Sequence, residues 1–144
     1  MINQNQEWIK EIYQTKIMLR YEGKYLLLKK VRDIHPDHIG GWEVPGGKIK
    51  PHEDPVEASL REIQEETGLD CRIVTELKFL ELEKVGIKTY THVYLAEASN
   101  NKVKLSDEHS DYKWISYEKI DTLKNVIYRD LFKQYVIDAE KVMA

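Results

Sequence analysis

Cysteine is nearly absent from this 144-residue sequence, which contains Cys71 alone. A single thiol excludes an intrachain disulfide and fits a reducing compartment. The sequence also lacks an apolar run approaching the ~20 residues that cross a bilayer. Its first residues, MINQNQEWIKEIYQ, lack the apolar centre of a signal peptide. We therefore expect a cytoplasmic protein that has no membrane partner.

An excess of positive charge is absent as well. The chain has 22 Lys and Arg residues against 25 Asp and Glu, a net charge of −3, whereas domains that coat nucleic acid are usually basic. A single nucleotide is not excluded, because a small anion needs only a local site. The composition is 42% hydrophobic and 33% charged, and no repeat or Ser-, Gly- or Pro-rich linker interrupts it. We expect one soluble domain over residues 1–144.

Patterns typical of strands and of helices alternate irregularly along the chain. Strands are predicted on both sides of a turn at residues 22–24, around the Pro-Gly-Gly turn at 45–47, over 70–82 and 87–97, and over 112–116. A last helix is predicted from about Val126 onwards, with Ile127, Leu131 and Tyr135 facing the core. Because strict βαβ alternation is missing, we expect an α+β sandwich with a mixed sheet between helices.

One helix has clear start and stop residues. Asp54 is a good N-cap, Pro55 suits the first helical position, and Glu57 occupies the position of a capping-box partner. Gly68 is a natural C-terminal stop. These residues predict a helix over residues 55–67.

Carboxylates are concentrated on one side of this predicted helix. At about 100° per residue, an apolar stripe is expected to pack on the sheet. It consists of Val56, Leu60, Ile63 and Thr67. Three glutamates fall within an arc of roughly 100° on a different side, where Ala58 leaves space: Glu62, Glu65 and Glu66. Hard divalent cations bind such oxygen ligands, and Mg²⁺ usually combines one or two carboxylates with water and substrate phosphate. The alternative is a solvated face with a Glu57-Arg61-Glu65 ion-pair ladder.

A longer pattern favours the metal site. The sequence matches G-x5-E-x7-R-E-U-x-E-E-x-G-U, where U is a bulky apolar residue, at all nine specified positions over 23 residues. The matching residues are Gly47, Glu53, Arg61, Glu62, Ile63, Glu65, Glu66, Gly68 and Leu69. This segment resembles the signature of the Nudix hydrolase family, which includes the MutT-type nucleotide pyrophosphohydrolases. The resemblance implies a Nudix-type α/β/α sandwich with a mixed central β-sheet.

The resemblance also implies roles for individual residues at a Mg²⁺ or Mn²⁺ site. The implied metal ligands are the carbonyl of Gly46 and the carboxylates of Glu62, Glu65, Glu66 and Glu108. Arg61 would orient the carboxylates, Glu62 is a candidate base, and Glu53 would be an outer carboxylate or fix the loop. The catalytic candidates are therefore Arg61, Glu62, Glu65 and Glu108.

Some of these assignments have rivals. Glu108 lies in the loop before the strand that contains Trp114, and Asp107 and Asp111 are alternatives to it. His52 occupies a position where many family members have glycine. Lys48 and Asn125 are candidate substrate-binding residues.

A second polar cluster offers a weaker metal site. Its members are Asp33, His35, Asp37 and His38. Two histidines without a cysteine are a weak indication of zinc, so a substrate-side loop is the preferred interpretation of residues 32–41.

The activity implied by the resemblance is Mg²⁺-dependent hydrolysis of a nucleoside triphosphate to monophosphate and pyrophosphate. The short single domain favours this MutT-like reaction, while ADP-ribose, dinucleoside polyphosphates and nucleotide sugars remain alternative substrates. A non-catalytic nucleotide-binding regulator is disfavoured, because all the glutamates of the signature are present. Family members are often homodimers, and the N-terminal strand is a candidate for pairing between two copies.

Overall fold

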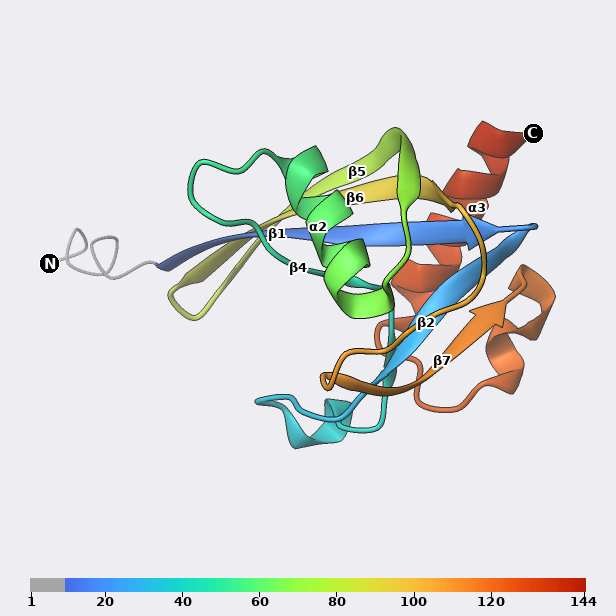
Figure 1. Cartoon of the computed structure of the whole chain (residues 1–144). Coiled ribbons are helices and arrows are strands. Elements are labelled where there is room, and N and C mark those ends of the chain that lie inside the picture. The colour runs from blue at the N-terminus through green and yellow to red at the C-terminus, as the bar shows by residue number, and fades with distance from the viewer. Residues whose placement is uncertain (1–9) are drawn as a thin grey trace, which may run out of the picture.

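The computed structural model describes residues 10–144, which form a seven-stranded mixed sheet with a helix on each face (Figure 1). The strands are β1 (Lys10–Tyr21), β2 (Lys24–Lys30), β3 (Trp42–Glu43), β4 (Gly46–Lys48), β5 (Cys71–Lys84), β6 (Ile87–Ala98) and β7 (His109–Ile115). The helices are α2 (Pro55–Thr67), α3 (Arg129–Met143) and the 3₁₀ segments η1 (Pro36–His38) and η2 (Tyr117–Thr122). The sequence predicted this α+β sandwich. Within the described residues, no helix combines the length and the apolar character that crossing a bilayer requires.

Strand β1 lies in the middle of the sheet. The strand order is β3-β2-β1-β6-β5, while β4 pairs with β1 and β7 pairs with β2. The β1–β6 pairing is parallel and all the others are antiparallel. β1 is thus bordered by β6 on one side and by β4 and β2 on the other. On the latter side the paired residues of β1 are Gln14–Lys16 and Arg20–Tyr21, and pairing between two copies through the N-terminal strand stays a prediction.

Alternation along β1 separates two cores. Successive side chains of a strand point to opposite faces of the sheet. Ile17 and Leu19 therefore pack with Ile63 of α2, whereas Met18 packs on the other face with Phe132 and its neighbours in α3.

Helix α2 has the predicted ends but a different buried face. Asp54 and Glu57 form the capping box, and Gly68 ends the helix with φ of 69°. The expected apolar stripe is wrong at its outer members, because Val56 is 38% and Leu60 is 39% exposed. Ile63 and Thr67 are buried as predicted, and Ala58, Ser59 and Glu66 are buried with them in place of Val56 and Leu60.

The rotation of α2 has a local cause in its small and polar residues. Ser59 is fully buried, and its hydroxyl lies 2.5 Å from the hydroxyl of Thr15 in β1. Ala58 is fully buried as well, so the helix approaches the sheet closely along this line. This orientation turns Glu66 into the interior instead of leaving it on a solvated face.

Helix α3 begins later than the sequence predicted. Val126 forms a parallel bridge with Trp42, and Tyr128 has a left-handed φ of 51°, so the helix starts only at Arg129. Leu131 is consequently 47% exposed, which contradicts its predicted place in the core. The buried residues of α3 are Phe132, Tyr135, Val136 and Ala139.

Candidate functional site

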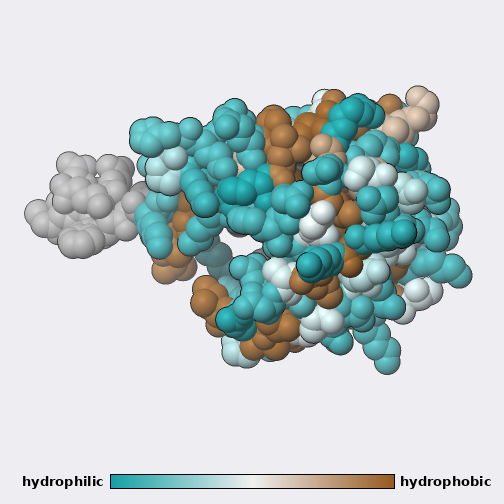
Figure 2. Space-filling model, viewed as in Figure 1, coloured by the Kyte–Doolittle hydropathy of each residue, from teal (hydrophilic) through white to brown (hydrophobic). Residues whose placement is uncertain are grey.

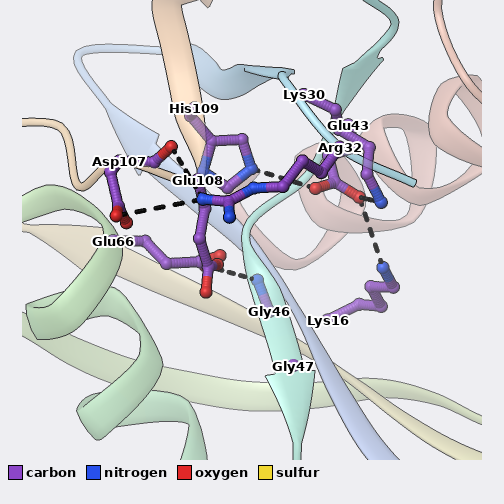
Figure 3. A pocket seen from close by; sticks show the side chains of 10 residues that line it. All are labelled: Lys16, Lys30, Arg32, Glu43, Gly46, Gly47, Glu66, Asp107, Glu108 and His109. Carbon is purple, nitrogen blue, oxygen red and sulfur yellow. Dashed lines mark hydrogen bonds and ion pairs between the residues drawn. The ribbon is translucent and has the colours of Figure 1, made fainter. Parts of the chain in front are cut away.

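A pocket of about 620 Å³ gathers residues from β1, β2, β3, β4, α2 and the start of β7. Hydrophilic side chains predominate on the face shown in Figure 2, which is visibly hollowed. Acidic and basic side chains line the pocket together (Figure 3). The acidic ones are Glu43, Glu66, Asp107 and Glu108, and the basic ones are Lys16, Lys30 and Arg32. Gly46, Gly47 and His109 complete the lining.

Two glycines let the backbone of β4 lie between β1 and α2. A Cβ atom on Gly46, which has φ of 154°, would overlap the carbonyl oxygen of Thr15. A Cβ atom on Gly47 would lie 2.5 Å from Oε1 of Glu62. The amide of Gly46 donates a 2.9 Å hydrogen bond to Oε1 of Glu66. The two glycines therefore allow the carboxylates of Glu62 and Glu66 to lie directly against the backbone of β4.

These contacts predict different effects for two alanine substitutions. Gly46→Ala should lower the free energy of unfolding by roughly 1–3 kcal/mol, because a side chain at this φ is strained and meets β1. Gly47→Ala should leave stability nearly unchanged but lower turnover on the order of 10²-fold by displacing Glu62. Chemical denaturation and initial rates measure the two effects. Equal losses of stability in both variants would contradict this distinction.

Arg61 connects the glutamates of the signature. Its Nε and Nη2 atoms bind Glu53 at 2.8 and 2.9 Å, and Nη1 lies 2.9 Å from both Glu62 and Glu65. Nη2 also donates to the carbonyl of Lys48, whose side chain is exposed and lies outside the pocket lining. The hydrogen bonds from Arg61 lower the pKa of Glu53 to about 2.

Glu53 in turn fixes the loop before α2, since its carboxylate accepts the amide of Lys50 at 3.0 Å. In that loop His52 adopts a left-handed φ of 67°, the conformation for which a glycine would be suited.

Four carboxylates, those of Glu43, Glu62, Glu66 and Glu108, interact in and beside the pocket. Glu66 is only 4% exposed, and burial raises its pKa to about 8. The hydrogen bond from Gly46 opposes this rise, while the negative charges of Glu62, Glu43 and Glu108 add to it. Burial also raises the pKa of Glu62, against the effect of Arg61. Buried carboxylates that hinder one another's ionisation, and that present only oxygen atoms, fit a hard divalent cation.

The other predicted ligands lie in different surroundings. Glu65 is outside the pocket lining, with its side chain 49% exposed and bound to Arg61. Glu108 and Asp107 both line the pocket, whereas Asp111 does not, and its carboxylate instead accepts the amide of Tyr112. Of Asp107, Glu108 and Asp111, only Glu108 has a carboxylate oxygen close to other potential metal ligands.

Within residues 10–144, one group of three side chains has ligand atoms that all lie within 4.8 Å of one another: Glu66, Glu108 and His109. The alternative cluster around His35 and His38 does not form such a group. There Asp33 binds Lys30 at 2.7 Å and accepts the amide of His35.

Sequence reasoning assigned no role to five residues of the pocket: Lys16, Lys30, Arg32, Glu43 and His109. Glu43 lies 3.4 Å from Lys30, 3.9 Å from Lys16 and 3.0 Å from His109. Burial tends to raise the pKa of Glu43, but His109 and the two lysines outweigh it and leave the pKa below its usual value. A lysine on a strand normally indicates a solvated edge, so no local pattern marked these residues.

Asn125 has a structural contact rather than a place in the pocket. It is exposed, adopts a left-handed φ of 60°, and its carbonyl accepts the amide of Trp42. Its predicted role in substrate binding stays a prediction.

Comparison with protein families finds a match between residues 15–135 and the model of the NUDIX domain. Bis(5'-nucleosyl)-tetraphosphatase [asymmetrical] from Mus musculus is 32% identical over 105 residues, which cover 67% of this chain and 66% of the mouse protein. The alignment thus spans slightly less than two thirds of that relative. Nucleoside triphosphatase NudI from Escherichia coli K12 is 29% identical, with 72% of this chain and 80% of the relative covered.

Solved structures agree with the fold. The MutT protein from Methanosarcina mazei Go1 has a TM-score of 0.74 at 28% identity, covering 94% of this chain and 96% of its own. An Ap4A hydrolase from C. elegans, solved as a binary complex, has a TM-score of 0.71 at 25% identity. The coverage is 92% of this chain and 97% of that protein.

Proposed function

This chain belongs to the NUDIX domain family, and from that premise we propose that it is a divalent-metal-dependent hydrolase of nucleoside triphosphates or related nucleoside diphosphate derivatives. The observation that carries the proposal is the pairing of buried carboxylates with cationic side chains in one pocket. Carboxylates alone would repel a phosphate chain, and lysines alone would not hold a metal. Both together suit a metal–polyphosphate substrate.

The roles we propose follow the geometry of the pocket. Glu66, Glu62 and Glu108 would hold Mg²⁺ or Mn²⁺, with Gly46 and Glu65 as further predicted ligands. When bound, the cation would neutralise charge on nonbridging phosphate oxygens and make a water more acidic. Lys16, Lys30 and Arg32 would bind the phosphate chain, since all three line the same pocket. Arg61 would keep Glu62 and Glu65 in position through its ion pairs.

A MutT-like reaction, which releases a nucleoside monophosphate and pyrophosphate, is the first candidate. Hydrolysis of a dinucleoside tetraphosphate is the second, because the mouse relative carries that name and three basic side chains line the pocket. No polymer of nucleic acid is expected as a substrate, given the net charge of −3.

A substrate panel tests the proposal. Nucleoside triphosphates, diadenosine tetraphosphate, ADP-ribose and nucleotide sugars should each be incubated with the protein and Mg²⁺, and the products separated by chromatography. We expect monophosphate and pyrophosphate from a triphosphate. Formation of ATP and AMP from the tetraphosphate, at a higher kcat/KM, would favour the second candidate. Tight binding of nucleotides without hydrolysis of any would overturn the enzymatic proposal in favour of a regulator.

Glu108 can be distinguished from its neighbours by matched substitutions. Glu108→Gln should lower turnover about 10²-fold or more, as expected for a ligand or base, and far more than Asp107→Asn or Asp111→Asn. Binding of a non-hydrolysable analogue should change less than turnover, because a positioned water matters mainly in the transition state. Small, equal effects in all three variants would mean that none of these carboxylates takes part in catalysis. A dominant effect of Asp111→Asn would mean that Asp111 is the functional carboxylate.

A further inference from the structure

The imidazole of His109 is held in the pocket by one nitrogen and leaves the other without a partner. Its side chain is 2% exposed, and Nε2 lies 3.0 Å from Oε2 of Glu43. Nδ1 is buried and has no hydrogen-bond partner among residues 10–144. Leaving a buried polar atom unpaired costs about 1–3 kcal/mol, so a bound ligand that pairs with Nδ1 would remove this cost.

The contacts of Glu43 decide which nitrogen carries the proton. Lys16 and Lys30 lie near Oε1 of Glu43, so this carboxylate is ionised and can only accept hydrogen bonds. Nε2 of His109 must therefore donate to it. In the neutral ring the lone pair is then on Nδ1. A histidine that donates one ring N–H to a carboxylate and offers the other nitrogen is the usual arrangement of a metal-bound imidazole.

His109 belongs to a compact group with two carboxylates through one of its ring nitrogens, and Nδ1 is the nitrogen that Glu43 leaves free. The ligand atoms of Glu66, Glu108 and His109 lie within 4.8 Å of one another, although Glu66 comes from α2 and the other two from the start of β7 and the loop before it (Figure 3). Ligands that share an ion at about 2.0–2.2 Å are at most about 4.4 Å apart. The side chains would need to close by only a few tenths of an ångström.

We propose that Nδ1 of His109 is a direct ligand of the divalent cation held by Glu66 and Glu108, so that this site selects Mn²⁺ or Co²⁺ over Mg²⁺. The inference rests on the metal site of the proposed function and specifies its ligand set. Imidazole nitrogen is suited to transition metals, whereas Mg²⁺ prefers an all-oxygen shell. A site made of carboxylates alone would lack this selectivity.

Pulsed electron paramagnetic resonance of Mn²⁺ bound to the protein tests the proposal without any substrate. We expect ¹⁴N couplings of a bound imidazole, which change to ¹⁵N couplings when the protein is labelled with ¹⁵N-histidine. His109→Gln should abolish them, because glutamine reaches the position of Nε2 and can still donate to Glu43, but has no atom at Nδ1. The matched control is His92→Gln, since His92 also pairs with a glutamate but lies outside this pocket. The control should keep the couplings.

Calorimetric titration provides a second readout. In His109→Gln, Mn²⁺ binding should weaken about tenfold or more, while Mg²⁺ binding changes much less. Bound Mn²⁺ without nitrogen couplings in the wild-type protein would overturn the proposal, whether or not the variant folds. An equal affinity of the wild-type protein for Mg²⁺ and Mn²⁺ would do the same. Either result would leave the proposed hydrolase intact, because substrate cleavage with Mg²⁺ is measured separately.

Discussion

Glu66→Gln is expected to lower turnover by about 10²-fold or more and yet to stabilise the metal-free protein at alkaline pH. The loss of activity follows from removing a proposed metal-binding carboxylate that lines the pocket. The gain in stability follows from the raised pKa of about 8 in the folded protein, against an ordinary value of 4.5. A carboxyl with a raised pKa stabilises the fold fully below its unfolded pKa, and this contribution disappears as the pH rises through about 8.

Glutamine cannot ionise, so the variant escapes this loss while its Oε1 still accepts the hydrogen bond from Gly46. In EDTA, the variant should exceed the wild type by on the order of 4 kcal/mol at pH 9 and by less than about 1 kcal/mol at pH 5. Urea denaturation at the two pH values measures the effect. Glu81→Gln is the control, because its exposed pair with Lys88 at 3.8 Å contributes little. A variant that is less stable than the wild type at pH 9 would contradict the assigned environment of Glu66.

Removal of metal is expected to abolish hydrolysis, and Mg²⁺ or Mn²⁺ should restore it. The reason is that the pocket concentrates carboxylates that would otherwise repel a polyphosphate. Metal at about 100 times its Kd should also stabilise the fold by about 2.7 kcal/mol, because only the folded chain brings these ligands together. Assays after dialysis against EDTA, with metal content measured, test the first effect, and thermal unfolding tests the second.

The appropriate control for the stabilisation is Glu66→Gln, which should show a much smaller shift of Tm on addition of metal. Full activity in the presence of chelator, with a protein confirmed to be free of metal, would show that the carboxylate cluster has another purpose. A shift of the same size in the variant would place the stabilising ion elsewhere.

The sequence by itself determined the features that depend on neighbours along the chain. The capping box of Asp54 and Glu57, the stop at Gly68 and the ion pairs of Arg61 with Glu62 and Glu65 all connect residues within about one turn of helix. Their geometry follows from helical spacing, so a linear pattern is sufficient to predict them.

Only the tertiary structure decided which face of α2 is buried and which residues complete the pocket. Helical spacing placed Val56 and Leu60 against the sheet, but Ser59 meets Thr15 of β1, and this contact turns Glu66 inwards. Glu43 and His109 are 66 residues apart, and no local periodicity brings them together. They meet because β3 and β7 flank the same strand, β2. Strand pairing depends on packing between residues far apart in the sequence. The position of the His109 imidazole beside Glu66 and Glu108 is therefore seen only in the folded chain.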